Sequence, residues 1–106
     1  MAEWVDVAAV GEIAPGSYKV VDVDDAMILV FNIDGEYFAV DDVCSHDGSP
    51  LSGGKVEGCE IVCPRHFARF NIKTGEVTAP PAYEGIHTFP VRVQDSTIQV
   101  MDDRWD

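Results

Sequence analysis

The sequence predicts an all-β protein of antiparallel sheets, with a smaller, loop-rich part over roughly residues 43–83 set into the sheets. Two apolar runs, residues 26–33 and 36–40, flank Asp34-Gly35, a residue pair favoured in two-residue hairpin turns. Elsewhere, short Val-rich runs alternate with clusters of Gly, Pro, Asp and Ser, which are typical of turns. No segment shows the apolar repeat of 3.6 residues that indicates a substantial helix. At this length, residues 1–106 are expected to form a single domain.

The other elements follow from the same reasoning. Further strands are expected over residues 4–10, 19–23, 55–57, 59–62, 68–72, 86–93 and 97–101. The adjacent residues Pro80 and Pro81 exclude a central strand over 78–85, because proline lacks the amide that a sheet ladder requires. Core candidates in the central hairpin are Ile28, Val30, Phe38 and Val40.

Two Cys/His pairs lie between the expected strands. Cys44 and His46 form the first pair, Cys63 and His66 form the second, and sixteen residues separate them. Thiolate and imidazole together are the mixed ligand set of iron–sulfur and zinc sites. In one kind of [2Fe–2S] centre, histidines replace cysteines on one of the two irons. Each expected ligand loop is short and flanked by strands, which holds ligands rigidly, so these four residues are the candidate metal ligands.

The spacing Cys44-x-His46 and Cys63-x₂-His66 resembles that of the Rieske [2Fe–2S] proteins. Residues 70–76 (FNIKTGE) and the two prolines at 80 and 81 are similar to the soluble Rieske ferredoxins of bacterial aromatic-ring-hydroxylating dioxygenase systems. The resemblance covers nearly the whole chain. It implies the Rieske (ISP-domain) fold and one Rieske-type [2Fe–2S] cluster as cofactor. It also implies that Pro80 or Pro81 belongs to a loop that packs near that cluster; the alternative is an ordinary connector. Many family members have Gly directly after the second His, where this chain has Phe67.

The resemblance also implies a one-electron carrier that is not itself an enzyme. Such a carrier accepts electrons from an NADH-dependent flavoprotein reductase and passes them to a terminal non-haem iron oxygenase in aromatic hydrocarbon catabolism. The chain is too short to be that oxygenase, which needs a further mononuclear iron site. Two alternatives within the fold are the small subunit of an assimilatory nitrite reductase and an accessory of iron–sulfur assembly. From a different class, the four ligands could bind one Zn²⁺ and hold a structural interaction module together.

Four positions bear on the reduction potential. High-potential Rieske proteins of respiratory complexes, which this motif also resembles, carry a disulfide at positions that correspond to Ser49 and Arg65 here. They also place Ser and Tyr hydroxyls, which donate hydrogen bonds to sulfur, where this chain has Ala68 and Phe70. Without these features a potential near the bottom of the Rieske range, roughly −150 mV, is expected.

The composition limits which kinds of partner and which cellular compartment are expected. The 19 acidic and 7 basic residues give a formal net charge of −12, which argues against nucleic acid as a partner. An acidic surface suits docking on basic patches of other proteins, or it serves solubility alone. The N-terminus lacks a signal peptide pattern, and no run of eighteen apolar residues suggests a membrane span. The odd number of cysteines, three, argues against a disulfide-stapled secreted domain. The cytoplasm is the expected compartment.

Three further residues are candidates for a role near the site. Cys59 is expected to be a small buried hydrophobic residue, because four ligands are already supplied. His87 is far from both pairs in sequence and is expected to be structural or on the surface. Asp47, which follows His46, is either solvated or biases the cluster electrostatically.

Overall fold

The computed structural model describes residues 3–45 and 47–104, and within them the chain forms eleven strands and no helix. The strands are β1 (Trp4–Ala9), β2 (Ser17–Val23), β3 (Ala26–Ile33), β4 (Glu36–Asp41), β5 (Lys55–Glu57), β6 (Glu60–Val62), β7 (Arg69–Asn71), β8 (Val77–Ala79), β9 (Thr88–Phe89), β10 (Val91–Gln94) and β11 (Thr97–Met101). They form three sheets with the orders β1-β11-β10, β2-β3-β4-β9 and β5-β6-β7-β8, in which every pairing is antiparallel. The all-β prediction is confirmed. In this part of the chain, no helix could cross a membrane.

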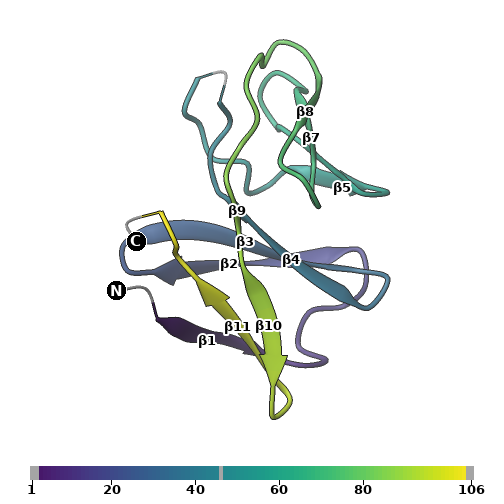
Figure 1. Cartoon of the computed structure of the whole chain (residues 1–106). Coiled ribbons are helices and arrows are strands. Elements are labelled where there is room, and N and C mark those ends of the chain that lie inside the picture. Colours follow the sequence, from purple (N-terminus) through teal and green to yellow (C-terminus); the bar gives the residue numbers. More distant parts are fainter. Residues whose placement is uncertain (1–2, 46, 105–106) are drawn as a thin grey trace.

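The first two sheets form a base, and the third sheet stands on it with the loops around it (Figure 1). Strand β3 lies between two cores, which explains why its sequence is almost continuously apolar. Ile28 and Val30 belong to the core shared with the β1-β11-β10 sheet. Leu29 and Phe31 belong to the core shared with the β5–β8 sheet. The same strand therefore joins the base to the loop-rich part of the chain.

The β3–β4 hairpin forms as predicted. Asp34 and Gly35 adopt φ values of 52° and 90°, the left-handed conformation that a two-residue hairpin turn requires. The Asn32 side chain supports the turn, because its Oδ1 accepts a hydrogen bond of 2.8 Å from the amide of Gly35. Of the predicted core residues, Ile28, Val30 and Val40 are fully buried, whereas Phe38 is partly buried and packs against the core.

The prediction of a single strand over residues 86–93 is wrong. The segment instead forms β9, which pairs with β4, and β10, which pairs with β11, so it changes sheet at Pro90. Proline has no amide to donate, and it marks the point at which one ladder ends and the next begins. The short strand β8 was also not predicted from the sequence. Its place at the edge of its sheet agrees with the exclusion of a central strand there.

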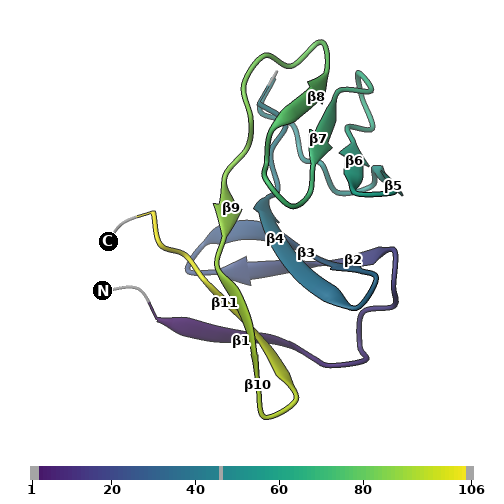
Figure 2. The same ribbon diagram turned by 45° about the vertical axis from the view of Figure 1, so that its right-hand side comes forward.

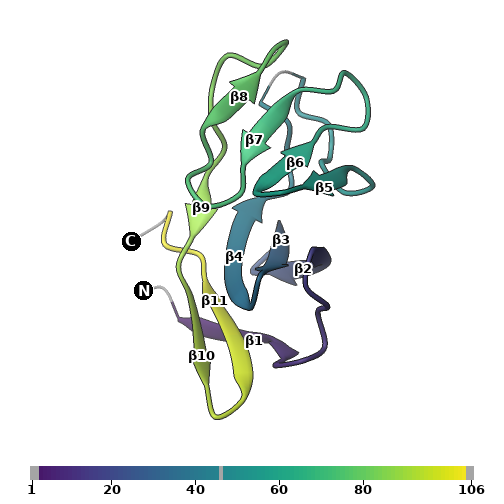
Figure 3. The same cartoon turned by 90° about the vertical axis from the view of Figure 1, so that its right-hand side faces the viewer.

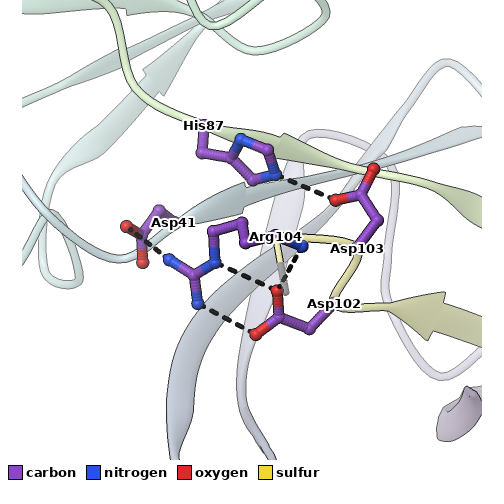
Figure 4. Close-up of polar contacts among 5 residues, drawn as sticks. All are labelled: Asp41, His87, Asp102, Asp103 and Arg104. Atoms are coloured by element: carbon purple, nitrogen blue, oxygen red, sulfur yellow. Dashed lines mark hydrogen bonds and ion pairs between the residues drawn. The ribbon is translucent and has the colours of Figure 1, made fainter. Parts of the chain in front are cut away.

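An ion-pair cluster links the C-terminal segment to the end of β4 (Figure 4). The Arg104 guanidinium donates to both carboxylate oxygens of Asp102 at 3.0 Å, and to Asp41 at 3.3 Å. Hydrogen bonding by Arg104 holds the pKa of Asp102 below its usual value, whereas burial raises the pKa of Asp41. Asp41 is the last residue of β4 and lies three residues before Cys44, so this cluster supports the start of the first ligand loop.

Replacing Arg104 with Met is expected to lower the free energy of unfolding by about 1–2 kcal/mol. The Asp102 side chain, which is 4% exposed, would lose the cation that compensates its burial. Denaturant-induced unfolding measures the change. Lys55→Met is a matched control, because among the described residues no hydrogen bond or ion pair involves the Lys55 side chain. An equal loss of stability in both variants would contradict this role of Arg104.

Candidate cluster-binding site

Both candidate ligand loops lie at the end of the molecule that is remote from the β1-β11-β10 sheet (Figures 2 and 3). The first loop follows β4, and the second connects β6 to β7. Cys44, Cys63 and His66 lie in these loops, whereas His46 is outside the described residues. The fold therefore brings Cys44, Cys63 and His66 to one end of the molecule.

The two loops share one backbone hydrogen-bond pattern. In the first loop, the amide of Cys44 donates to the carbonyl of Ser49 at 2.7 Å, and the carbonyl of Cys44 accepts from the amide of Gly48 at 2.8 Å. In the second loop, the amide of Cys63 donates to Ala68 at 2.7 Å, and its carbonyl accepts from Phe67 at 3.0 Å. Each cysteine is thus held at the neck of a tight loop of the same construction.

The repeated pattern explains the conformation of Phe67. Gly48 and Phe67 occupy equivalent positions, four residues after Cys44 and Cys63, and their φ values are 78° and 63°. Glycine adopts this left-handed conformation readily, whereas a residue with a Cβ pays about 1–2 kcal/mol for it. The loop shape is therefore kept although Phe stands where many Rieske proteins have Gly, and the Phe67 side chain is 70% exposed.

The donor set fits a Rieske-type cluster, in which thiolates would hold one iron and imidazoles the other. Cys44 and Cys63 are fully buried and belong to one apolar core, with Leu51, Ala68 and Phe70. His66 is 47% exposed at its side chain, and its Nε2 lies 3.4 Å from Oδ2 of Asp47 in the other loop. Buried thiolates beside a surface imidazole match the ligand types of the two irons in a Rieske centre.

Two residues outside the motif position the first loop. Oδ1 of Asp42 accepts hydrogen bonds from the amides of Leu51 and Ser52, at 2.7 and 2.9 Å. The Tyr18 hydroxyl donates to the carbonyl of Gly54 at 3.0 Å and accepts from the amide of Gly53 at 2.9 Å. Neither role was predicted from the sequence. Asp42 could have been suspected, because an Asp directly before a loop often accepts hydrogen bonds from the loop's amides. The contact of Tyr18 joins residues 36 positions apart, and no local sequence pattern indicates it.

Gly54 permits a close approach between the two loops. A Cβ on Gly54 would lie 2.0 Å from the carbonyl oxygen of Val62, the residue before Cys63. No side chain fits there, so the end of the first loop packs directly on β6, the strand that leads to Cys63.

The Pro-containing loop lies against the first ligand loop. The Ser45 hydroxyl donates a hydrogen bond to the carbonyl of Glu84. Pro80 and Pro81 are joined by a cis peptide bond, and Ala82 enters the same core as the two cysteines. This position agrees with the expectation from the family resemblance.

The remaining candidates lie outside the donor set. Cys59 is partly buried and packs against the core that contains Cys44 and Cys63. His87 pairs with Asp103 at 3.0 Å and packs edge-on against Phe89, so it is structural, as expected (Figure 4). Among residues 3–45 and 47–104, no three His, Cys, Asp or Glu side chains are grouped closely enough to hold a single metal ion.

Comparisons with known proteins agree with this geometry. The family model described as "Rieske [2Fe-2S] domain" matches residues 3–90. The ferredoxin component of a naphthalene 1,2-dioxygenase system from Pseudomonas aeruginosa is 33% identical over 98 residues, which cover 92% of this chain and 94% of the relative. The ferredoxin of carbazole 1,9a-dioxygenase from Nocardioides aromaticivorans IC177 superposes with a TM-score of 0.88 at 31% identity, over 92% of this chain and 95% of that one.

A complex of reduced oxygenase and oxidised ferredoxin in carbazole 1,9a-dioxygenase contains a further similar chain. Its TM-score is 0.87 at 31% identity, over 92% of this chain and 91% of that one. The family match includes all four candidate ligands, Cys44, His46, Cys63 and His66. The chain therefore belongs to the Rieske [2Fe-2S] domain family, which implies one Rieske-type [2Fe–2S] cluster as its cofactor.

Proposed function

We propose that this chain is a one-electron carrier, the Rieske ferredoxin of a multicomponent oxygenase system. It passes electrons from an NADH-dependent flavoprotein reductase to a terminal non-haem iron oxygenase that acts on an aromatic compound, and it has no catalytic site of its own. Residues 1–106 act as a single domain, and roughly residues 43–83 hold the cluster through Cys44, His46, Cys63 and His66. The protein works in the cytoplasm.

The observation that carries this proposal is the pair of equivalent ligand loops at one end of the molecule. They hold two cysteines in a dry core and present His66 at the surface. The naphthalene dioxygenase ferredoxin component and the two carbazole dioxygenase structures described above support the same role. Buried cysteines protect an iron–sulfur cluster from solvent, and an exposed imidazole gives an electron a short path to a partner.

The bound cluster supplies a site that gains and loses one electron; the residues of this chain supply position and environment. The backbone hydrogen bonds at both loop necks, together with those of Asp42 and Tyr18, fix the ligand loops. Fixed ligands keep the geometry change small when the charge on the cluster changes, and a rigid site of this kind favours electron transfer.

Two exposed aromatic side chains at this end suit contact with a partner protein. Phe67 follows His66 and is 70% exposed, and Tyr83 in the Pro-containing loop is 87% exposed. A groove of about 480 Å³ borders the second ligand loop and is lined in part by Cys63 and Phe67. Exposed aromatic residues beside a groove are enriched at protein interfaces, which supports docking at the cluster-binding end.

Reconstitution tests the proposal. The purified, cluster-loaded chain is combined with a flavoprotein reductase, NADH and the terminal oxygenase of a naphthalene or biphenyl dioxygenase system. We expect product formation to require this chain and to be lost with His66→Ala. If the chain instead restored electron flow only to the large subunit of a nitrite reductase, the nitrite reductase alternative would replace this proposal. Activity in cluster assembly alone would favour an assembly accessory.

The charge distribution leads to a prediction about ionic strength. Residues 43–83 contain four acidic and four basic residues, so the formal net charge of −12 lies outside the cluster-binding part. If the negative charge outside residues 43–83 steers a partner protein, the electron-transfer rate at limiting protein concentration should fall as the salt concentration rises. Asp24→Asn with Asp25→Asn should weaken that dependence. Stopped-flow reduction at several salt concentrations measures it, and a rate that is insensitive to salt would assign the acidic charge to solubility.

A further inference from the structure

Asp47 connects the two ligand loops. Its Oδ1 accepts a hydrogen bond of 3.0 Å from the amide of Ser49 within the first loop. Its Oδ2 lies 3.4 Å from Nε2 of His66 in the second loop. The Asp47 side chain is 27% exposed. The carboxylate is therefore held in place by its own loop while it faces a candidate ligand of the other.

The contact identifies which nitrogen of His66 is available to iron. Because Nε2 faces Asp47, Nδ1 is the ring nitrogen left for a metal. A carboxylate on the outer nitrogen of a metal-bound imidazole makes that imidazole a stronger donor and adds negative charge close to the metal. Both effects oppose the arrival of an electron, which makes the metal centre more negative.

The other acidic residues of the cluster-binding part have a different environment. Glu57 and Glu60 pair with Arg69 at 2.7 and 3.2 Å, so a cation offsets their charges. Glu76 is exposed on the turn between β7 and β8. Asp47 is distinguished by its position against a candidate ligand rather than by its charge alone.

We propose that Asp47 is a potential-setting residue whose carboxylate acts through His66 to lower the reduction potential of the cluster. This inference rests on the proposed function, because it requires His66 to be an iron ligand. High-potential Rieske proteins carry hydroxyl groups and a disulfide that raise the potential, and this chain lacks both. Asp47 is a residue of this chain that lowers the potential further.

The test compares Asp47→Asn with wild type by protein-film voltammetry on cluster-loaded protein at one fixed pH. Asparagine has nearly the same shape and keeps an oxygen for the Ser49 amide, but it removes the charge. Glu76→Gln is the matched control, because it removes one acidic charge from the same part of the chain, on the exposed β7–β8 turn. EPR spectra of all three reduced proteins establish that the ligand set is unchanged.

We expect Asp47→Asn to favour the reduced state by roughly three- to tenfold, as suits a partly exposed charge near a reducible centre. A tenfold change corresponds to an upward shift of about 59 mV for one electron. Glu76→Gln should shift the potential much less. An unchanged or lower potential in Asp47→Asn, or an equal shift in Glu76→Gln, would overturn the inference.

Two further outcomes separate this inference from the proposed function. If the wild-type chain gives no Rieske-type EPR signal, the proposed function fails and this inference falls with it. If Asp47→Asn does not load a cluster, Asp47→Ser retains an oxygen near the Ser49 amide and is measured in its place. Failure of both variants to load, while Glu76→Gln loads normally, would overturn the electrostatic role and make Asp47 an assembly residue.

Discussion

Replacing either His46 or His66 with Ala is expected to abolish the Rieske-type EPR signal of the reduced protein. Each change removes an imidazole nitrogen that we propose as an iron ligand, and a Rieske-type centre requires two imidazole ligands on one iron. Iron content per chain should fall in parallel. EPR spectroscopy of the dithionite-reduced proteins, normalised to protein concentration, measures the effect.

Two variants serve as controls for this loss. Cys59→Ser changes a partly buried thiol that packs against the same core as Cys44 and Cys63. His87→Gln changes an imidazole that pairs with Asp103 at the C-terminal segment. Both proteins should keep the EPR signal. If Cys59→Ser lost the cluster while Cys63→Ser kept it, the assignment of the second ligand loop would be wrong.

A reduction potential near the bottom of the Rieske range, roughly −150 mV, is the second large expected effect. Ala68 and Phe70 are fully buried in the core that also contains Cys44 and Cys63, and neither has a hydroxyl group. Hydrogen bonds to sulfur stabilise the more negative reduced state, so a core without such donors keeps the potential low. A low potential suits a carrier whose electrons originate on NADH.

The double variant Ala68→Ser with Phe70→Tyr should raise the potential by an amount on the order of 59 mV, a tenfold change in the one-electron equilibrium. Protein-film voltammetry on loaded protein measures it. Phe89→Tyr is the control, because it adds a hydroxyl in the other core of the molecule. A wild-type potential well above zero, or a double variant with an unchanged potential, would defeat the explanation.

Local signals in the sequence were sufficient for most of the fold. The β3–β4 hairpin was predictable because Asp34-Gly35 is a turn signal and the flanking strands are strongly apolar. Strand β5 was predicted at its observed bounds between two turn-rich segments. The change of sheet at Pro90 was not predicted, because a segment of short apolar runs does not specify which strand each run will pair with.

The candidate site divides in the same way. The ligand motif was visible because the spacing of Cys44, Cys63 and His66 is local to two short loops. The supporting contacts were not, since Tyr18 meets Gly54 across 36 residues and Arg104 meets Asp41 across 63. Contacts of this kind depend on how the sheets pack. The contact between Asp47 and His66 was likewise not predictable from the sequence. The sequence indicated only that Asp47 is either solvated or biases the cluster electrostatically.

The most direct test of the central claim is EPR with nitrogen-hyperfine analysis of the purified wild-type chain, combined with metal and sulfide determination. Two irons and two acid-labile sulfides per chain, with two coordinated histidine nitrogens in the reduced state, are the expected result. A colourless protein with one zinc per chain would contradict the account and favour the structural module.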